Sequence, residues 1–347
     1  MSAAPLPTIA VIVPNWNDAR FLPRCLRSVL EQETPADQLI IVDDASTDNS
    51  VALIRQIISG NSRAELIVNA SNLGVYGAVD RALERARSDY VLFLAANDFV
   101  LPGIFTRARD CLSRSPGIGL WSAMVWRVDE ADNLVRLHPS PVIALRDRVF
   151  SPEECVKLAH RVGNWFTGTT LIYRRDAVQA ADAFDPAYRG AADLITALVV
   201  ASRHGVAYTP EPFGAFRIHA GSHSSSTLSD VARLEAMLDR LAVRGPELSP
   251  QLFTKAFVER IVLRYRFAAV RESAGTAIST VAARFSGWRR LALDFIDRWV
   301  PRKLERLRVA LAFAILSPFD LWPTLMNRLL GWVIVRLRIG LSGEALP

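Results

Sequence analysis

Short apolar runs alternate with amphipathic segments in the first part of the chain, and this alternation constrains the fold more than any other feature. The runs are rich in β-branched residues, as buried strands of parallel sheets are. They span residues 8–14, 39–44, 64–68 and 89–94. Apolar positions at helical spacing predict helices between them, over 21–32, 48–58 and 74–87. Strict alternation of strands and helices predicts a doubly wound α/β sheet with right-handed crossovers.

Polar residues follow each of the four predicted strands. These segments are Pro14 to Asn17, Asp43 to Ser46, Asn69 to Gly74 and Ala95 to Asp98. In open α/β sheets, ligands bind beyond the carboxyl ends of the strands. We therefore expect the four segments to meet in one ligand-binding crevice.

The second half of the chain continues this pattern and then changes character. We expect a strand over 169–174, a helix over 191–204 and extended chain over 206–219. Beyond residue 227 the pattern is helical almost throughout. Because the Ser-rich stretch 221–229 interrupts both periodicities, we predict an α/β domain over 1–226 and a helical region over 227–347.

Composition places the chain among globular proteins. Half of its residues are hydrophobic and 22% are charged, which argues against extended disorder. Cys25, Cys111 and Cys155 lack a CxxC or Cys/His pairing, so neither a disulfide framework nor a zinc site is expected. Residues 1–7 lack a basic segment followed by an apolar one, so we expect no signal peptide and a cytoplasmic location.

The net charge of +6 is a property of the C-terminal part of the chain. Residues 1–254 hold 25 basic and 28 acidic side chains, whereas residues 255–347 hold 16 and 7. A basic tail suits an anionic partner, either nucleic acid or an acidic membrane surface.

Apolar residues recur at helical spacing within this basic tail, a pattern that suits the surface of an anionic bilayer rather than nucleic acid. They are Phe285, Trp288, Leu291, Phe295 and Trp299. No apolar run in the tail approaches the ~20 residues needed to cross a membrane. We therefore predict peripheral, in-plane binding to the inner face of the cell membrane. A shallow re-entrant hairpin, a soluble helical cap and an oligomer interface are the alternatives.

Seven segments resemble, in order and spacing, family 2 of the GT-A glycosyltransferases. Within residues 8–226 they are VIVPNWNDARFLPRCLRSVLEQ, IIVDDASTDNS, NLGVYGAVDRAL, DYVLFLAANDFVLPG, TGTTLIYRRDAV, GAADLITALVVASRHGVAYTPEP and FRIHAGSHSSS. The resemblance implies the GT-A fold, a doubly wound mixed sheet of Rossmann-like type. It also implies an inverting transferase that moves a sugar from a nucleotide diphosphate donor to a hydroxyl of a lipid-linked, polysaccharide or other glycan acceptor.

The first two strand ends hold candidates for binding the donor base. Trp16 is expected to stack its ring on a nucleobase, and filling a gap in the core is the alternative. Asp44 is expected to accept a hydrogen bond from the base. Asp43 is expected to cap the turn, and Asp48 to cap the helix that follows.

Further donor contacts are expected from the other strand ends. Asn72 and Gly74 precede a helix, whose N-terminal N–H groups can approach ribose or phosphate. Val79 stands where the family has an Arg beside the donor, which leaves the base and ribose contacts open there. The expected donor-binding residues are Pro14, Trp16, Asn17, Asp44, Asn72, Gly74, Asn97, Asp98 and Arg217.

The fourth strand end departs from the family's Asp-x-Asp-Asp type of run, whose carboxylates hold Mg²⁺ or Mn²⁺ against the donor diphosphate. Residues 95–98 are Ala-Ala-Asn-Asp, so the first Asp and the metal-contacting third are absent. An amide oxygen binds a divalent ion without a formal charge, and therefore more weakly. We still expect Mg²⁺ or Mn²⁺, with Asn97, Asp98 and His219 as ligands. Arg217 is expected beside the diphosphate.

The expected catalytic base is Asp193, which aligns with the Asp of the family's Glu-Asp motif at a helix start. Its carboxylate can remove the proton from an acceptor hydroxyl while that oxygen attacks the anomeric carbon. The preceding Glu of the motif is Ala192 here. Capping the helix is the alternative role for Asp193, and Asp185 is an alternative base. Trp165 and Thr167 are expected to line the acceptor side.

The departures at Ala95, Asn97 and Ala192 keep a second hypothesis open. It is a catalytically silent protein of the same fold that binds nucleotide sugars or acts as a scaffold. A nucleotidyltransferase is less well supported, because no Gly-rich phosphate loop with a basic residue follows the first strand. Processive synthesis is disfavoured by the lack of a QxxRW-type motif and of transmembrane helices. The sequence leaves the donor base, the sugar and the acceptor open.

Overall fold

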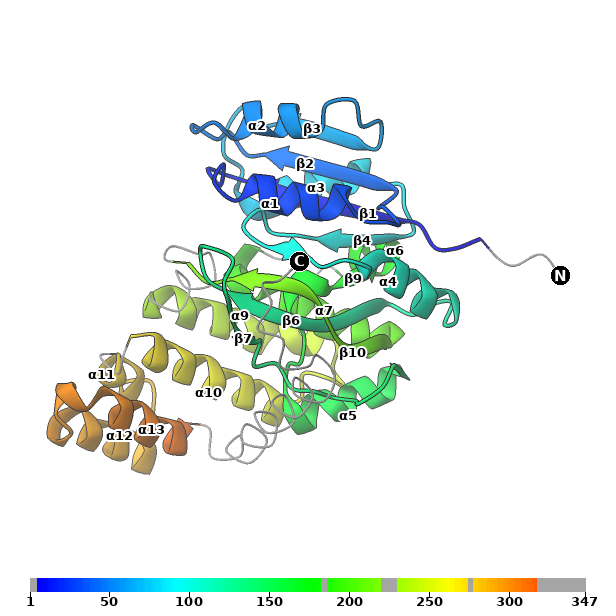
Figure 1. The fold of residues 1–347 in the computed structure, drawn as a ribbon. Coiled ribbons are helices and arrows are strands. Elements are labelled where there is room, and N and C mark those ends of the chain that lie inside the picture. Colours follow the sequence, from blue (N-terminus) through cyan, green and yellow to red (C-terminus); the bar gives the residue numbers. More distant parts are fainter. Residues whose placement is uncertain (1–4, 182–185, 220–229, 274–276, 317–347) are drawn as a thin grey trace.

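A ten-stranded mixed sheet forms the centre of the molecule (Figure 1). The structure is a computed structural model that describes residues 5–181, 186–219, 230–273 and 277–316. Along the sheet the strands follow the order β3-β2-β1-β4-β9-β6-β10-β5, with β7 beside β6 and β8 beside β10. The expected α/β fold with a mixed sheet is therefore confirmed.

The first half of the sheet consists of parallel strands joined by helices, as predicted. The strands are β1 (Ile9–Asn15), β2 (Gln38–Asp43), β3 (Ala64–Val68) and β4 (Tyr90–Phe93). The connecting helices are α1 (Leu22–Leu30), α2 (Ser50–Ile57) and α3 (Gly74–Arg85). Because neighbouring strands pair in parallel, the carboxyl ends of β1 to β4 share one edge of the sheet.

The second half of the sheet mixes parallel and antiparallel neighbours. Its strands are β5 (Phe99–Val100), β6 (Leu120–Val128), β7 (Leu134–Leu137), β8 (Arg148–Phe150), β9 (Ile172–Arg174) and β10 (Val206–Arg217). Its helices are α4 (Ile104–Ser113), α5 (Pro152–Val162), α6 (Arg175–Gln179) and α7 (Ala192–His204), with the short 3-10 turns η1 (Gly168–Thr170) and η2 (Pro186–Ala191). The predicted helix 191–204 and extended segment 206–219 are confirmed. The predicted strand 169–174 begins only at Ile172, because residues 168–170 form the η1 turn.

Two apolar layers cover the two faces of the sheet. On one face, Leu26 of α1 and Phe105 of α4 lie in a buried cluster with Val11 of β1. On the other face, Ala82 of α3 and Val199 of α7 belong to a larger buried cluster. The central strands are therefore covered on both sides, which is why their sequences are apolar without alternation.

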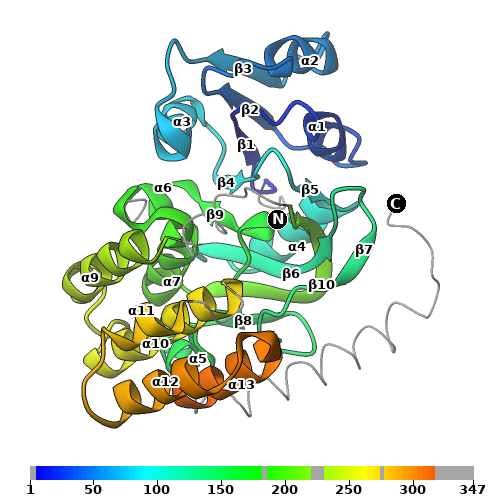
Figure 2. The same ribbon diagram turned by 90° about the vertical axis from the view of Figure 1, so that its left-hand side faces the viewer.

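Helices follow β10 through the rest of the described chain. They are α9 (Val231–Leu248), α10 (Lys255–Glu272), α11 (Ile278–Ala282), α12 (Gly287–Trp299) and α13 (Glu305–Leu316), with the 3-10 turn η3 (Arg302–Leu304). Figures 1 and 2 place α12 and α13 at the opposite end of the molecule from β3. Within the described ranges, no helix has the length and apolar character to span a bilayer. The predicted boundary at 221–229 and the segment 317–347 lie outside the described residues.

Helices α9 and α10 pack onto the sheet rather than standing apart from it. Leu234 and Leu241 of α9 and Phe257 of α10 belong to the same buried cluster as α3 and α7. Arg266 of α10 donates two hydrogen bonds, of 2.8 and 2.7 Å, to the buried carboxylate of Glu235 in α9. A bidentate pair of this kind fixes both distance and orientation between two helices.

Two arginines of α10 cap the end of α5. Arg264 donates to the carbonyl oxygen of Val162 at 3.0 Å, and Arg260 donates to the carbonyl oxygens of His160 and Arg161. The last carbonyl groups of a helix have no partner within the helix. These contacts satisfy them and attach α10 to the segment that leads into η1.

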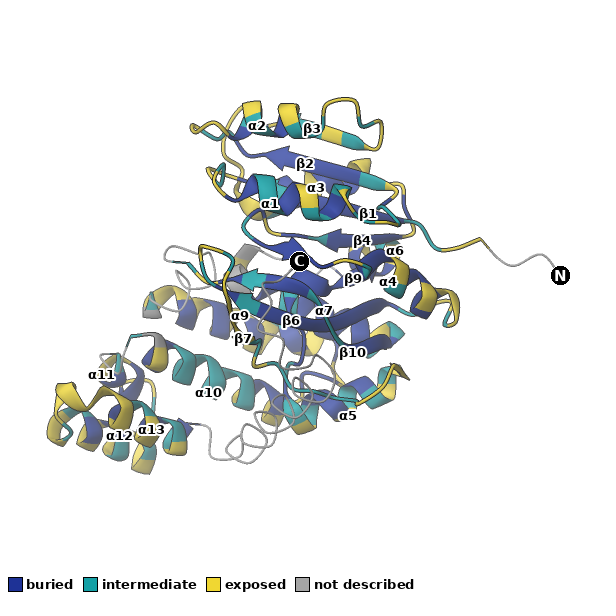
Figure 3. Cartoon of the chain, viewed as in Figure 1, coloured by how far each residue is buried: buried dark blue, intermediate teal, exposed yellow. Residues whose placement is uncertain are grey.

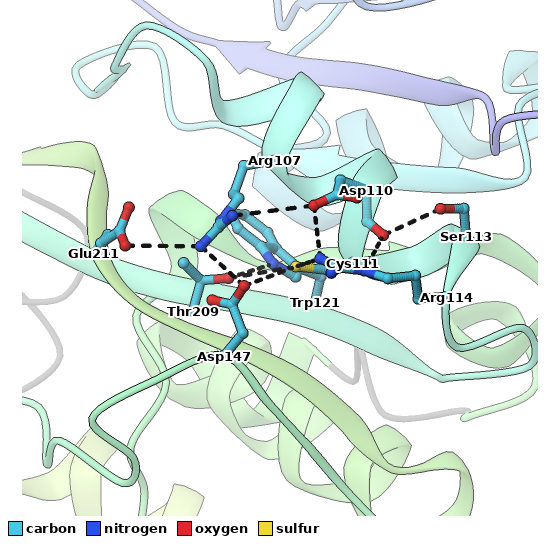
Figure 4. Close-up of polar contacts among 9 residues, drawn as sticks. All are labelled: Arg107, Asp110, Cys111, Ser113, Arg114, Trp121, Asp147, Thr209 and Glu211. Atoms are coloured by element: carbon cyan, nitrogen blue, oxygen red, sulfur yellow. Dashed lines mark hydrogen bonds and ion pairs between the residues drawn. The ribbon is translucent and has the colours of Figure 1, made fainter.

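A polar cluster ties α4 to the strands β6 and β10 (Figure 4). Arg107 of α4 forms ion pairs with Asp147 at 2.9 Å and Glu211 at 3.7 Å. The indole of Trp121 in β6 donates to the hydroxyl of Thr209 in β10 at 3.1 Å. The cluster joins a helix, a loop and two strands, so it ties α4 to the far half of the sheet.

Gly205 ends α7 with a φ of +75°, and a Cβ added there would lie 2.5 Å from the carbonyl oxygen of Phe150. We expect Gly205→Ala to lower the free energy of unfolding by roughly 3 kcal/mol, because backbone strain adds to a clash with backbone. Gly60→Ala is the matched control, since its φ is +77° and nothing lies within 4 Å of the added Cβ. The control should lose about 1 kcal/mol. Urea unfolding measures both values, and equal losses would contradict the role given to the Phe150 contact.

Candidate functional site

Side chains join the loops that follow β1 and β2. Asp43 accepts a hydrogen bond from the backbone N–H of Ser46 at 2.9 Å, which confirms the predicted turn cap. Asp43 also accepts from the side-chain amide of Asn15 at 2.7 Å. Asn17, with a φ of 57°, accepts from the N–H of Thr47 at 2.7 Å. These contacts hold the two loops side by side.

Trp16 lies in the first of these loops with 55% of its surface exposed. The alternative that it fills a gap in the core is therefore wrong. The ring is accessible to a nucleobase, and stacking on a base stays a prediction. Pro14 lies within β1, in register with Val42 of β2, so it positions this loop from the sheet.

Asp48 bonds to the start of α2, in keeping with the predicted capping role, and also to the loop after β1. It accepts from the backbone N–H of Ala19 at 3.0 Å and of Ser50 at 3.0 Å. The N-cap position of α2 belongs to Asn49. Asn49 makes no side-chain capping bond, so Asp48 is the side chain that satisfies the first N–H of α2.

Asp44 is buried and holds the loop that precedes α3. Its carboxylate accepts from the side-chain amide of Asn69 at 2.7 Å and from the backbone N–H groups of Leu73 and Gly74 at 2.8 Å each. Asn72 also accepts from Gly74 at 2.9 Å. The Gly74 N–H is thus engaged, so its expected approach to a phosphate finds no support here. Asp44 shapes the loop, and a contact of Asp44 with the base stays a prediction.

Arg81 of α3 extends this network, and sequence reasoning missed it. Its guanidinium donates to the side-chain oxygen of Asn69, which in turn donates to Asp44. Arg81 lies two residues after Val79, the position where the resembling family has an Arg. A basic side chain is therefore present at this loop, two residues further along the chain than in the family.

Asp98 is a buried carboxylate that joins three segments of the chain. It follows β4, accepts from the backbone N–H of Arg217 at the end of β10 at 2.9 Å, and accepts from the hydroxyl of Thr169 in η1 at 2.7 Å. Burial raises the pKa of Asp98 to about 7, and these two hydrogen bonds act in the opposite direction. The role of Thr169 was missed, although it belongs to the TGTT segment that the sequence singles out.

Arg217 is 2% exposed, and its guanidinium is satisfied inside the protein. It donates to the carbonyl oxygens of Asn97 at 2.7 Å and Asp129 at 3.1 Å and pairs with Asp132 at 2.5 Å. It also lies over the ring of Phe21, 4.6 Å from the ring centroid. The expected contact with a diphosphate therefore finds no support. Arg217 instead fixes the β6–β7 turn against the end of β4.

The three expected metal ligands lie together, but they do not form a metal centre. Asn97 donates from its side-chain amide to Nε2 of His219 at 2.9 Å. Both oxygens of Asp98 accept hydrogen bonds within the protein. Across the described part of the chain, no group of three or more His, Cys, Asp or Glu side chains could hold a metal ion. The residues present therefore do not fit a cation site that the protein builds alone.

Asp193 opens α7 beside η1. An added Cβ at Gly168 would lie 2.6 Å from Oδ2 of Asp193, so the carboxylate rests against the turn because residue 168 is a glycine. Tyr173 donates its hydroxyl to the carbonyl oxygen of Asp193 at 3.0 Å. Burial raises the pKa of Asp193 to about 6, while the backbone N–H groups of Leu194 and Asp193 act in the opposite direction. The N-cap position belongs to Ala191, so Asp193 is not the cap residue of this helix.

The expected acceptor-side residues are buried in the structure. Trp165 lies in the core, with its ring centroid 4.5 Å from that of Phe166. It therefore offers no open aromatic face to a sugar, and this expectation is corrected. Thr167 is also buried, and its hydroxyl lies 2.9 Å from that of Ser140 and 3.3 Å from Nδ1 of His138. Burial lowers the pKa of His138 to about 3, so this histidine is neutral.

The structure thus connects the fourth strand end to the candidate base. Asp98 bonds Thr169, and the adjacent Gly168 contacts Asp193. Asp185, the alternative base, lies outside the described residues. A hollow of about 750 Å³ lies between α1 and α2, and none of the predicted site residues lines it.

We expect Arg217→Ala to lower the free energy of unfolding by roughly 3 to 5 kcal/mol, because it leaves buried carbonyl groups and Asp132 without their partner. Arg20→Ala is the matched control. Arg20 also lies over the Phe21 ring, at 4.3 Å, and pairs with Glu130 at 2.9 Å, but its side chain is 58% exposed. The control should lose less than about 1 kcal/mol. Guanidinium chloride unfolding compares the two, and a small loss for Arg217→Ala would refute its buried role.

Comparison with known proteins agrees with this geometry. Residues 10–178 match the family model described as Glycosyl transferase family 2. TuaG of Bacillus subtilis, provisionally named a teichuronic acid biosynthesis glycosyltransferase, is 36% identical over 92 residues. The aligned segment covers 26% of this chain and 36% of TuaG.

Two solved structures share the fold. S. aureus TarS 1–349 in complex with UDP-GlcNAc has a TM-score of 0.60 at 16% identity, with 90% of each chain covered. The mannosyltransferase PcManGT from Pyrobaculum calidifontis, in complex with GDP-Man and Mn²⁺, has a TM-score of 0.54 at 20% identity, covering 97% of this chain and 89% of that chain. The parallel strands, the polar strand ends and the matched segment lead to one conclusion: residues 10–178 belong to glycosyltransferase family 2, and the chain has a GT-A fold.

Proposed function

We propose that the chain transfers a sugar from a nucleotide diphosphate donor to a hydroxyl of a glycan acceptor, with inversion at the anomeric carbon. Membership of glycosyltransferase family 2 supports the reaction class. The observation that carries the proposal is the state of Asp193. Its carboxylate rests against Gly168, with a pKa raised to about 6 by burial.

The proposed reaction is a single displacement with Asp193 as general base. The carboxylate accepts the proton of the acceptor hydroxyl as that oxygen forms a bond to the anomeric carbon. The bond from this carbon to the diphosphate oxygen breaks on the opposite face, and the nucleoside diphosphate leaves with the electron pair. A carboxylate with a pKa near 6 is basic enough to take the proton and is still ionised at neutral pH. Tyr173 and Gly168 act as positioning residues for it.

The donor is proposed to bind across the carboxyl ends of β1 to β4. TarS and PcManGT were solved with UDP-GlcNAc and GDP-Man, which are both nucleoside diphosphate sugars. In this chain the exposed ring of Trp16 supplies a stacking surface for the base. Asn17 and Asp44 hold the loops on either side of the proposed donor position.

The acceptor is proposed to be a lipid-linked or polysaccharide glycan of the cell envelope, used at the cytoplasmic face of the membrane. The name of TuaG, which refers to teichuronic acid biosynthesis, supports an envelope polymer. The basic C-terminal helices support a position at an anionic membrane surface. In this plan residues 1–226 form the transferase domain, and residues 227–347 form the appended helical region.

A divalent cation stays a prediction for this site. PcManGT was solved with both GDP-Man and Mn²⁺. Asn97 and His219 are the candidate contacts here, because Asp98 is turned into the protein. Such an ion supplies charge neutralisation of a diphosphate when it is bound.

A catalytically silent nucleotide-sugar-binding or scaffold protein is the second candidate. Ala95, Asn97 and Ala192 favour it, because each replaces an acidic residue of the family pattern. Binding of a nucleotide sugar without turnover, with and without added metal, would support this candidate over the transferase.

We expect Asp193→Asn to lower kcat by roughly a thousandfold, because an amide cannot accept the acceptor proton. Asp176→Asn is the matched control. Asp176 also lies in the first turn of a helix, α6, but it pairs with Arg174 at 2.6 Å near the surface. Release of nucleoside diphosphate from a panel of nucleotide sugars with glycan acceptors measures turnover. Full activity of Asp193→Asn would remove the base assignment.

The pH dependence of activity is a second test of Asp193 as the base. Because the pKa of Asp193 is about 6, kcat/KM of the wild type should reach a plateau above about pH 7 and fall about tenfold per pH unit below pH 5.

The same pKa also predicts how stability depends on pH. The pKa of Asp193 in the folded protein exceeds the ordinary value of about 3.9, so the protonated group favours folding. This stabilisation is complete below about pH 4 and is lost as the pH rises through about 6. As the pH rises from about 4 to about 6, the Tm of Asp193→Asn should therefore increase relative to the Tm of the wild type. A relative shift in the opposite direction would contradict a raised pKa.

We expect Mn²⁺ to tighten the binding of UDP or GDP by less than about tenfold in the wild type and by more in Asn97→Asp, because a carboxylate adds a formal charge. Asn61→Asp is the matched control, since Asn61 lies between α2 and the start of β3, at the opposite edge of the sheet. Isothermal titration calorimetry with Mn²⁺ or with a chelator measures the effect. The same response in all three proteins would exclude position 97 from cation binding.

A further inference from the structure

Helix α12 carries a row of large apolar side chains on its outer face. Trp288, Leu291, Phe295 and Trp299 are exposed by 62%, 70%, 61% and 65%. Their spacing of three, four and four residues places them on one face of the helix over about 16 Å. We call these four residues the α12 face. Figure 3 shows the outward side of α12 as exposed.

The opposite side of α12 is packed, so the α12 face is held in place by the fold. Leu293 and Ile296 are buried in a small core with residues of α10, α11 and α13. The buried guanidinium of Arg308 in α13 donates to the carbonyl oxygens of Ile296 at 3.2 Å and Val300 at 2.6 Å. The α12 face is therefore held by a helix whose opposite side is packed into a core.

Positive charge surrounds the α12 face. Arg289 lies over the ring of Trp288 at 5.5 Å, and Arg298 lies over the ring of Trp299 at 5.7 Å. Residues 284–308 contain eight Arg or Lys and three Asp or Glu. Of the acidic residues, Asp294 pairs with an arginine of the same helix and Asp297 pairs with the buried Arg308. The rim is therefore net positive.

We propose that the α12 face docks onto an anionic lipid surface, with α12 lying in the plane of the headgroups. Trp and Phe rings flanked by arginines are typical of helices that bind anionic lipid surfaces. The rings enter the headgroup boundary, and the guanidinium groups bind lipid phosphates. An exposed apolar row of this size is uncommon on a monomer that stays in water. Within the described ranges no helix could span the bilayer, so the contact is peripheral.

Charge favours an anionic bilayer over two other possible partners of the α12 face, namely a second copy of the chain and the segment 317–347. A second copy would bring the same positive rim against itself. The segment 317–347 holds three Arg and two acidic residues in its sequence, so it supplies no negative surface either. An anionic bilayer complements both the apolar row and its rim. The proposal deepens the membrane part of the proposed function, and its test does not require sugar transfer.

The test is vesicle flotation of the full chain. Vesicles of phosphatidylcholine alone are compared with vesicles that contain about one quarter phosphatidylglycerol. We expect at least about tenfold stronger binding to the anionic vesicles, decreasing with added salt. In brominated-lipid vesicles, tryptophan fluorescence of the bound protein should be quenched. Changing Trp288, Leu291, Phe295 and Trp299 together to Ser should reduce binding at least about tenfold.

Changing Leu6, Val149 and Val243 together to Ser is the matched control, because these exposed apolar residues lie outside the α12 face. The control should bind as the wild type does. Unchanged flotation of the four-Ser variant, equal loss in the control, or no flotation of the wild type would overturn the proposal. A wild-type dimer that the four-Ser variant dissociates in light scattering, without vesicle binding, would assign the α12 face to a second copy. Thermal shift with UDP and GDP checks that each variant keeps its fold. Lack of sugar transfer in every protein would count against the proposed reaction and not against docking.

Discussion

The site depends on one carboxylate, that of Asp98, being kept away from water. Burying a charged or polar group is costly unless it is hydrogen-bonded, so Asp98 requires the N–H at the end of β10 and the hydroxyl of Thr169 at once. The ends of β4 and β10 and the η1 turn cannot separate without breaking these bonds. Since Gly168 lies in the same turn and contacts Asp193, the position of the proposed base follows from the same constraint.

Arg217 helps to offset the cost of burying Asp98. Its backbone bonds Asp98, while its guanidinium takes up carbonyl oxygens and Asp132 from a turn of β6 and β7. The residues that meet there come from positions about 97, 130, 169 and 217 of the chain. A basic residue at this strand end therefore contributes to assembly of the site rather than to a direct grip on a ligand.

Local patterns in the sequence were sufficient for the parallel strands, their helices and the Asp43 turn cap, because each depends on residues near one another in the chain. They were also sufficient to show that Trp16 stands at a strand end. They could not show that Trp165 packs on Phe166 in the core, or that Arg217 points inward, because the partners of these side chains are set by tertiary contacts. The bond of Asp48 to Ala19 could not be predicted for a similar reason, since it joins two loops. Ala192 has a further physical meaning: without a second acid beside it, Asp193 owes its raised pKa to burial rather than to a like charge.

Helices α9 and α10 share the buried cluster of α3 and α7, and Arg260 and Arg264 attach α10 to the end of α5. Helices α9 and α10 are therefore part of the same packed interior as the sheet. A substitution that changes the volume of Leu234 or Phe257 alters the packing beneath α7, the helix that carries Asp193. A change of volume in the interior beneath the sheet therefore calls for a compensating change on the inner faces of α9 and α10, whereas the outer surface of α12 takes no part in that packing.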